Sequence, residues 1–256
     1  MKILNKKDIF KFLKLHKIKR DDLVLIHGNA SIFTQVIGDS KNKKISNFWI
    51  FLREYFNKKG TVIVPSFTYC LTDNKVYNPK KTAGKIGLFS ESFRKLKFTK
   101  RTNHPIFSMS FFGSQSQNIM KSSNNTCFGK NSLFEFLHKK NAKLLCLGCS
   151  YNELTYTHYI EEKVGVKYRY LKKFKGFYLL NGKRKKIETN YFVRNLDYYI
   201  STNLNLRKLI YSLKKKGSYI YKNFGRLSSH SIRAKLFFLE GKNKLKKNKH
   251  YLIGNY

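Results

Sequence analysis

This sequence has very few acidic residues and no long apolar segment. Only 14 Asp and Glu accompany 53 Lys and Arg among 256 residues, which gives a formal net charge of +39 at pH 7. No apolar run approaches the length that spans a bilayer, and lysines interrupt the apolar positions of residues 1–22, unlike in a signal peptide. These absences predict a cytoplasmic protein without a membrane span, whose long-range field disfavours polycationic ligands and favours anionic ones.

The chain also lacks the short motifs of several large enzyme classes. No G-x-G-x-x-G follows an expected strand and no Walker-type loop is present, which argues against a Rossmann dehydrogenase and a P-loop NTPase. Cys146 and Cys149 form a C-x-x-C pair, but no second pair or nearby histidine has zinc-ligand spacing. Because both follow an apolar run, we expect them to pack in the core and expect no metal cofactor.

The excess of lysine has two interpretations. A dedicated nucleic-acid surface would concentrate charge on one element, with base-reading side chains nearby. The lysines are instead scattered along the chain, together with a surplus of Asn, Ile, Phe and Tyr, the residue set that an AT-rich coding sequence favours. We therefore prefer compositional bias and expect no specific nucleic-acid partner. A basic nucleic-acid-binding protein remains the alternative from another functional class.

Apolar runs typical of buried strands alternate with helical patterns, which predicts an α/β fold. Neither a linker nor an internal repeat divides the chain, so we expect residues 1–256 to form a single domain. We expect three layers (α/β/α) with a mixed sheet, and antiparallel strands in the C-terminal third, where residues 168–193 alternate around Asn181-Gly182. The other expected strands are 23–27, 61–64, 106–112 and 144–147; the expected helices lie within 1–22 and over 45–56, 87–97, 132–138, 153–164, 206–214 and 228–239; and 66–85 is expected to be a long binding loop.

A histidine and a glutamate three residues apart stand out from this pattern. His158 and Glu161 lie in an expected helix, where this spacing puts both side chains on one face. The carboxylate can then accept one imidazole N–H and leave the other nitrogen free as a base. The pair follows a buried strand that ends at Gly148, and α/β folds usually place their chemistry at such strand ends. Its other interpretation is an ordinary pair on a helix surface.

A series of segments, individually weak, occurs in an order and spacing that resemble the aminoglycoside 3-N-acetyltransferase family. They cover about the first two thirds of the chain. The matching segments are Asp22 through Ser31, Gly60 through Thr68, Gly87 through Arg94, Arg101 through Ser108, Gly113, Phe128-Gly129 with Ser132, Leu144 through Gly148, and Thr155 with His158 and Glu161.

The resemblance implies transfer of an acetyl group from acetyl-CoA to an amino sugar. It implies contacts with the coenzyme or its loops from Ser31, Ser66 and Ser108, and with a coenzyme phosphate from Arg101. His104 either shapes the coenzyme tunnel or has a structural bonding role. The first loop departs from the family, since Gly28-Asn29-Ala30 stands where two serines and a leucine are usual. A family member without activity is therefore a further alternative.

The reaction needs a base, because an ammonium group cannot attack a thioester. His158 fits this role, with Glu161 holding its tautomer and stabilising the imidazolium, and no acyl-enzyme is required. An oxyanion forms during attack, so a donor must point at it. Thr155, one turn before His158, is the candidate, and a backbone N–H is an equal alternative.

The scarcity of carboxylates predicts the kind of acceptor. A polycationic aminoglycoside calls for a pocket lined with carboxylates, and this chain has only 14 acidic residues in total. We therefore expect an amino sugar that carries negative charge, such as a nucleotide-linked amino sugar destined for a surface glycan. The sequence leaves the oligomeric state open, including a homo-oligomer.

Overall fold

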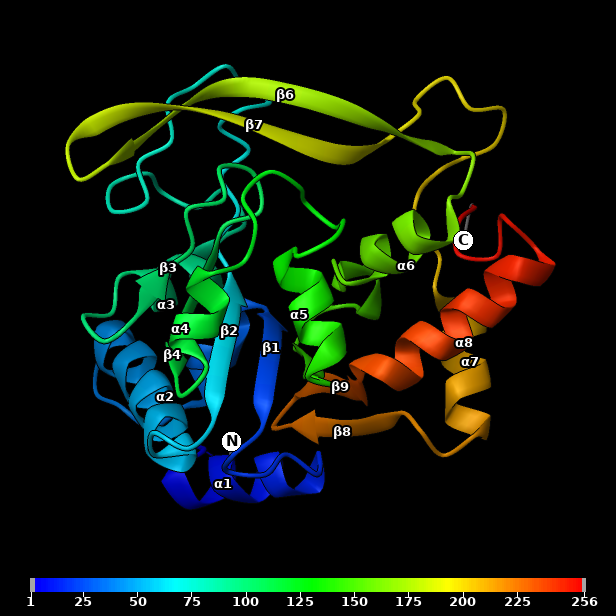
Figure 1. Cartoon of the computed structure of the whole chain (residues 1–256). Helices are drawn as coiled ribbons and strands as arrows, with labels where there is room; N and C mark the ends of the chain where they lie inside the picture. The colour runs from blue at the N-terminus through cyan, green and yellow to red at the C-terminus, as the bar shows by residue number, and fades with distance from the viewer. Residues whose placement is uncertain (1–2, 255–256) are drawn as a thin grey trace.

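A seven-stranded mixed sheet forms the centre of the protein, in a computed structural model that describes residues 3–254 (Figure 1). Its strands are β1 (Leu23–Gly28), β2 (Thr61–Pro65), β3 (Lys100–Arg101), β4 (Met109–Gly113), β5 (Lys143–Leu147), β8 (Ile220–Phe224) and β9 (Leu227–Arg233). Their order is β3-β4-β2-β1-β5-β9-β8. The central strands β2, β1 and β5 are parallel, whereas the strands on either side pair antiparallel.

Helices cover both faces of this sheet, because alternate residues of its buried strands point to opposite sides. Val24 and Ile26 of β1 belong to one core cluster, and Leu23 and Leu25 belong to the other. The helices are α1 (Lys6–Leu15), α2 (Lys41–Phe56), α3 (Leu88–Arg94), α4 (Ser116–Met120), α5 (Leu133–Lys139), α6 (Thr157–Val164), α7 (Arg207–Lys215) and α8 (Ala234–Lys247), with 3₁₀ turns η1 (Ala30–Gln35) and η2 (Tyr151–Glu153). Helices α1 to α3 pack in the first cluster and α4 to α8 in the second, so the predicted three-layer α/β class is confirmed.

A second sheet consists of one long antiparallel hairpin, β6 (Arg169–Leu180) and β7 (Lys183–Arg194), as the alternating pattern predicted. Asn181 and Gly182 form its turn with φ of +50° and +76°, the left-handed conformation that a two-residue hairpin turn requires. In Figure 1 the hairpin runs across the top of the molecule. Backbone bonds fasten it to the loops beneath: Leu179 donates to Tyr77, and Cys127 donates to Asn190.

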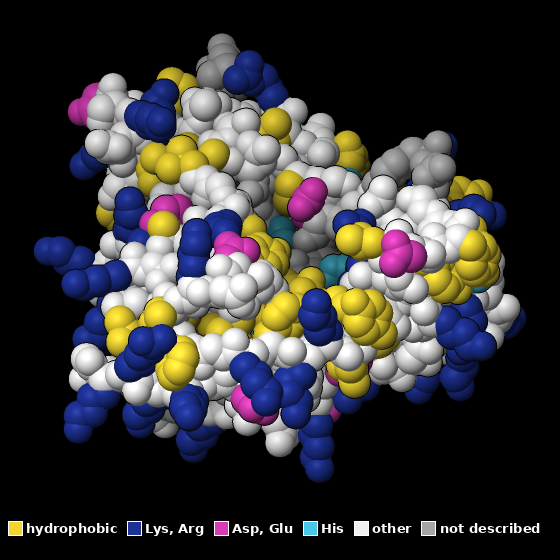
Figure 2. Space-filling view, turned by 90° about the horizontal axis from the view of Figure 1, so that it is seen from above, with side chains coloured by type: hydrophobic (Ala, Val, Ile, Leu, Met, Phe, Trp, Pro, Cys, Tyr) yellow, Lys and Arg dark blue, Asp and Glu magenta, His cyan; other side chains and the backbone are white. Residues whose placement is uncertain are grey.

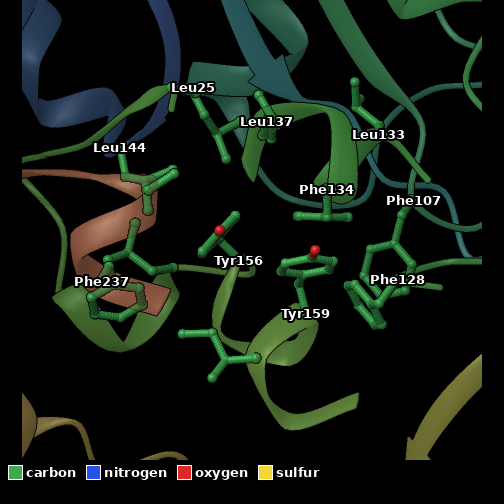
Figure 3. Close-up of a cluster of buried hydrophobic side chains, with 14 of the residues drawn as sticks. Leu25, Phe107, Phe128, Leu133, Phe134, Leu137, Leu144, Tyr156, Tyr159 and Phe237 are labelled. Atoms are coloured by element: carbon green, nitrogen blue, oxygen red, sulfur yellow. The ribbon is translucent and has the colours of Figure 1, made fainter. Parts of the chain in front are cut away.

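Aromatic side chains fill the core behind α6. Figure 3 shows Phe107, Phe128 and Phe134 packed together, with Tyr159 facing them. The Phe128 ring lies 5.0 Å from that of Phe107 and 4.9 Å from that of Phe134, between centroids. The centroid of the His158 ring lies 5.5 Å from that of the Phe128 ring. This packing fixes α6 against the core and gives the histidine a rigid support.

One predicted helix is wrong in its first half. Residues 228–239 were expected to be helical, but residues up to Arg233 belong to β9, and only α8 that follows is helical. Ser229 and Ser231 lie in the strand, paired with Leu147 and Leu145 of β5. Small polar residues give no apolar strand pattern, so pairing with β5 overrides the local signal. Strand β8, which has Lys222 and Asn223 in its interior, was also not predicted.

Two other expected elements begin later than predicted. The strand expected over 106–112 starts at Met109, because the backbone N–H groups of Ile106 and Phe107 are bonded to His104 Nδ1 in a turn. The helix expected over 153–164 starts at Thr157, after η2. No helix within residues 3–254 is long and apolar enough to cross a membrane.

A buried histidine ties the first helix to the last strand. His16, which follows α1, has no exposed surface, and its Nδ1 and Nε2 lie 2.8 and 2.9 Å from the hydroxyls of Ser231 and Ser229. Burial, reinforced by the nearby charge of Lys143, lowers the pKa of His16 to about 3. The folded protein therefore takes up a proton here much less readily than the unfolded chain does.

We expect this histidine to make folding sensitive to acid. Its contribution to stability is complete above the ordinary histidine pKa of 6.5 and is lost as the pH falls from there toward about 3. Urea unfolding of the wild type and of His16→Gln at pH 5, 6, 7 and 8 will measure it. The free energy of unfolding should fall less steeply below pH 6.5 in the variant, by about one proton. Equal slopes would contradict a buried neutral His16.

Candidate active site

A cavity of about 620 Å³ opens where the carboxyl ends of β1, β2 and β5 meet. This is the edge where α/β sheets bind ligands, and the volume suits a small organic molecule. Tyr191 of β7 lines the cavity from the hairpin. Seen from above, this face of the molecule has a hollow with histidine side chains at its bottom (Figure 2). The other lining residues are His27, Gly28, Asn29, Pro65, Phe67, Tyr69, Ile86, Ser90, Phe107, Gly148, Cys149, Ser150, Asn152, Glu153, Thr155 and His158.

The histidine and glutamate singled out in the sequence are in contact. His158 Nδ1 lies 2.7 Å from Glu161 Oε2, within hydrogen-bonding distance, one helical turn apart in α6. The side chain of Glu161 has no exposed surface, whereas that of His158 keeps 17% and lines the cavity. Because Nδ1 faces the carboxylate, Nε2 is the ring nitrogen that remains for a ligand.

Two residues at the start of the hairpin complete the surroundings of Glu161. Tyr168 donates a hydrogen bond of 2.9 Å to Oε1, and Arg169 Nε lies 2.7 Å from Oε2 as an ion pair. Burial acts to raise the pKa of Glu161, but it is outweighed by the charge that His158 carries when it is protonated at acidic pH, the charge of Arg169 and the hydrogen bonds from His158 and Tyr168, so this pKa is lowered. The carboxylate is therefore ionised at neutral pH, as an acceptor for the imidazole N–H must be.

His158 itself is neutral at neutral pH. Burial lowers its pKa below 6.5, with help from the charge of Arg169, and the opposing effect of Glu161 does not reverse this direction. A neutral imidazole that donates through Nδ1 has a lone pair on Nε2. The arrangement thus has the chemical capacity of a general base beside a cavity.

Thr155 lies on the same wall, next to a second histidine. Its Oγ1 is 3.2 Å from His27 Nε2, at the end of β1. Burial lowers the pKa of His27 to about 4, so this ring is neutral as well. The structure therefore brings Thr155, His158 and Glu161 together, and adds His27, which the sequence marked only as a strand-end histidine.

The predicted coenzyme residues Ser66, Ser108 and Arg101 form a buried network outside the cavity lining. Arg101 donates from Nη2 to the Ser66 carbonyl at 2.5 Å and from Nε to Ser108 Oγ at 3.2 Å, and it also bonds the Thr82 carbonyl. Ser108 Oγ donates to the same Ser66 carbonyl at 2.6 Å. These polar atoms already have partners within the fold. Any effect of the three residues on coenzyme binding is therefore expected to act through the loops that they hold in place.

His104 and Ser31 also lie outside the lining. His104 is buried, with Nδ1 accepting from Phe107 N at 3.0 Å and Nε2 within 3.2 Å of the Thr126 carbonyl, which is the structural bonding role considered from the sequence. Ser31 is exposed in η1, and its N–H donates to the Asn29 side chain at 2.8 Å. Contacts of these residues with coenzyme stay a prediction.

The unusual first loop has a packing reason. A Cβ on Gly28 would lie 2.5 Å from the Phe89 ring, so any larger residue would displace that ring. Asn29 caps η1 through its side chain and also lines the cavity. The loop thus reaches the cavity through Gly28 and Asn29, with a local geometry adapted to Phe89.

Sequence reasoning missed several residues of the site. Tyr168 and Arg169 hold Glu161; Tyr168 precedes β6 and Arg169 begins it. The only sequence signal for this contact was a basic residue a few positions after His158 and Glu161. Cys149 is half-buried and lines the cavity, whereas Cys146 is buried in β5 as expected. Within residues 3–254 no cluster of His, Cys, Asp and Glu has the arrangement of a metal site.

Solved structures with this fold include aminoglycoside acetyltransferases. AAC(3)-IIb superposes with a TM-score of 0.81 at 16% identity, over 97% of this chain and 98% of that one. AAC-IIIb in a binary complex with CoASH gives 0.80 at 16% identity, over 99% of both chains. The YokD protein from Bacillus subtilis gives 0.78 at 17% identity, over 98% of this chain and 96% of that one. At these identities the comparison establishes the fold.

The sequence supplies the family. No curated protein sequence matches the chain significantly. The family model described as aminoglycoside 3-N-acetyltransferase matches residues 25–246, which is most of the chain. The protein therefore belongs to the aminoglycoside 3-N-acetyltransferase family, and it is an N-acetyltransferase with acetyl-CoA as its cosubstrate. The resemblance stated from the sequence is confirmed.

The electrostatics of His158 can be measured directly. We expect its imidazole to titrate below pH 6.5, because burial and Arg169 disfavour the protonated ring. Proton NMR of the ring C–H signals across pH 4 to 8 will give the midpoint, with His158→Asn identifying the resonance. A midpoint above 6.5 would mean that the attraction of Glu161 prevails, and one above 7 that the ring is largely charged at neutral pH.

Proposed function

We propose that the protein transfers an acetyl group from acetyl-CoA to the amine of an amino sugar, with His158 as general base. One observation carries this proposal: on the cavity wall, a neutral imidazole has its Nδ1 held by a buried carboxylate, so that Nε2 is left for the substrate. Family membership supplies the reaction class. We further propose that a single domain performs this reaction in the cytoplasm.

The proposed reaction is a direct transfer. The acceptor amine attacks the thioester carbonyl while His158 Nε2 takes its proton, so a C–N bond forms and the C–S bond then breaks. The imidazolium stays paired with Glu161 and returns the proton to the departing coenzyme A thiolate. No covalent enzyme intermediate is needed. A base in position contributes about two to four powers of ten in rate.

The oxyanion of the tetrahedral intermediate needs a hydrogen-bond donor, and Thr155 is proposed for this role. Its hydroxyl faces His27 Nε2 at 3.2 Å. When His27 carries its proton on Nε2, it donates to Thr155 Oγ1. The threonine hydroxyl donates to the Glu153 carbonyl in a long hydrogen bond of 3.4 Å, and in this proposal it turns from there to the oxyanion. In this proposal His27, which also lines the cavity, acts as a positioning residue for Thr155.

The cavity supports an acceptor with few positive charges. Among its lining residues Glu153 is the only carboxylate, and Glu161 is fully buried behind His158. A polycationic aminoglycoside would therefore leave most of its ammonium groups without a partner, in a strongly basic protein. We propose a nucleotide-linked or other glycan-precursor amino sugar, whose phosphates match the charge of the protein.

Replacing the proposed base should remove catalysis and leave the fold intact. His158→Ala is expected to lower kcat by about two to four powers of ten, because the attacking amine loses its proton acceptor. Steady-state acetyl transfer and the urea-unfolding midpoint, measured on the same preparation, will separate chemistry from stability. Unchanged turnover in the variant would remove His158 from the mechanism.

A matched control addresses the nucleophile. Cys149→Ala removes the thiol that lines the cavity and that would be the nucleophile of an acyl-enzyme route. If transfer is direct, the variant should keep its turnover within about threefold of the wild type. Loss of activity in Cys149→Ala together with an acetylated Cys149 in the wild type would replace direct transfer by an acyl-enzyme route.

The acceptor proposal has a kinetic test. A nucleotide-linked amino sugar should have a kcat/KM at least about tenfold above that of kanamycin, which the cavity cannot pair with carboxylates. The comparison uses acetyl-CoA at saturation and two ionic strengths, since the advantage should shrink with added salt. Faster turnover of kanamycin would refute the charge argument.

A further inference from the structure

A second concave surface lies next to the cavity. A groove of about 800 Å³ runs along α7 toward the end of α8. All charged residues that line it are cations: Arg207, Lys208, Lys214, Lys215 and Lys244. Lys244 lies 3.8 Å from the Glu240 carboxylate, and no carboxylate in residues 3–254 pairs with the other four. We call this surface the basic groove.

A single short turn separates the basic groove from the cavity. Tyr151 of η2 lines the groove, whereas Asn152 and Glu153, its next two residues, line the cavity. Asn152 Oδ1 accepts a 3.0 Å hydrogen bond from Leu206 N, immediately before Arg207 at the start of α7. Because η2 has only three residues, consecutive residues of the chain line the groove and the cavity.

The groove also offers aromatic surface among its cations. Tyr211 is 61% exposed, with Lys215 Nζ 4.9 Å from its ring centroid. Tyr251 lies beside Lys244 in the same groove. Lysine and arginine without carboxylate partners bind phosphate oxygens, and exposed tyrosine rings stack on nucleobases. This combination fits a nucleoside diphosphate.

The cavity and the groove differ in charge, and a ligand with an amine at one end and phosphates at the other would match both. The cavity has one carboxylate, Glu153, and no lysine or arginine in its lining. The groove has five cations and no carboxylate in its lining. A sugar amine therefore suits the cavity, and phosphates suit the groove across η2.

We propose that the basic groove binds the nucleoside diphosphate part of the acceptor while its amino sugar lies in the cavity beside His158. This inference rests on the proposed acetyl transfer and adds a specificity site to it. The diphosphate linkage passes over η2, and Lys214 and Lys215 on the exposed side of α7 contact the phosphates. The diphosphate of coenzyme A has the same chemistry and could bind the basic groove instead. The experiment below distinguishes these two ligands.

A charge reversal with a matched control tests the groove. Lys214→Glu/Lys215→Glu removes two of its cations, and Lys246→Glu/Lys247→Glu makes the same change of net charge at exposed positions of α8 outside the groove. We expect the first variant to raise the KM of the nucleotide-linked amino sugar by about tenfold or more, with kcat and the KM of acetyl-CoA unchanged. The control should change each constant by less than about twofold.

Binding of UDP, dTDP and GDP without acetyl-CoA provides a readout that does not depend on turnover. Calorimetry should detect binding to the wild type and the control, weakened about tenfold in Lys214→Glu/Lys215→Glu. Equal binding by all three proteins would overturn the inference, as would a rise in the KM of acetyl-CoA alone, which would assign the groove to the coenzyme. If the diphosphates bind as expected but no amine is acetylated, the proposed function fails and the groove stands.

Discussion

The site depends on the contacts that hold one fully buried carboxylate, that of Glu161. Glu161 is held by His158, Tyr168 and Arg169, from α6, the connection after it and the first position of β6. A buried charge is tolerated only where such partners compensate for its lost hydration. Removing Arg169, the cationic partner of Glu161 in this buried ion pair, is expected to cost about 3–5 kcal/mol. The orientation of the catalytic candidate is thus coupled to the stability of the fold.

The same carboxylate links the hairpin to the cavity. Because Arg169 pairs with Glu161 and also donates from Nη1 to the Phe192 carbonyl, it fixes both strands of the hairpin relative to α6. The neighbouring residue of β7, Tyr191, then lines the cavity. One ion pair therefore aligns the imidazole below and the tyrosine above the space where the acceptor would lie.

Local sequence signals were enough for the parts of the fold that are determined locally. The apolar run of β1, the hairpin turn at Asn181-Gly182 and the spacing of His158 and Glu161 each appear within a few residues. The serine-rich β9 could not be predicted, because it becomes a strand only through pairing with β5 and bonding to His16. Arg169 as a partner of Glu161 was equally hidden, since two elements must meet before the contact exists.

The distribution of charge explains how so basic a protein can handle an amine. Apart from Lys143, which is buried in β5, the lysines of residues 3–254 are exposed or half-buried. The cavity is lined by neutral histidines and by tyrosines, and Glu153 is the one carboxylate in its lining. The long-range field therefore repels a free polyamine but attracts an amine that belongs to an anionic molecule. Near His158 the surroundings no longer oppose the amine, and a neutral imidazole is compatible with the proposed role of proton acceptor. A net charge that suggested nucleic acid from composition alone is thus compatible with a selective small-molecule acetyltransferase.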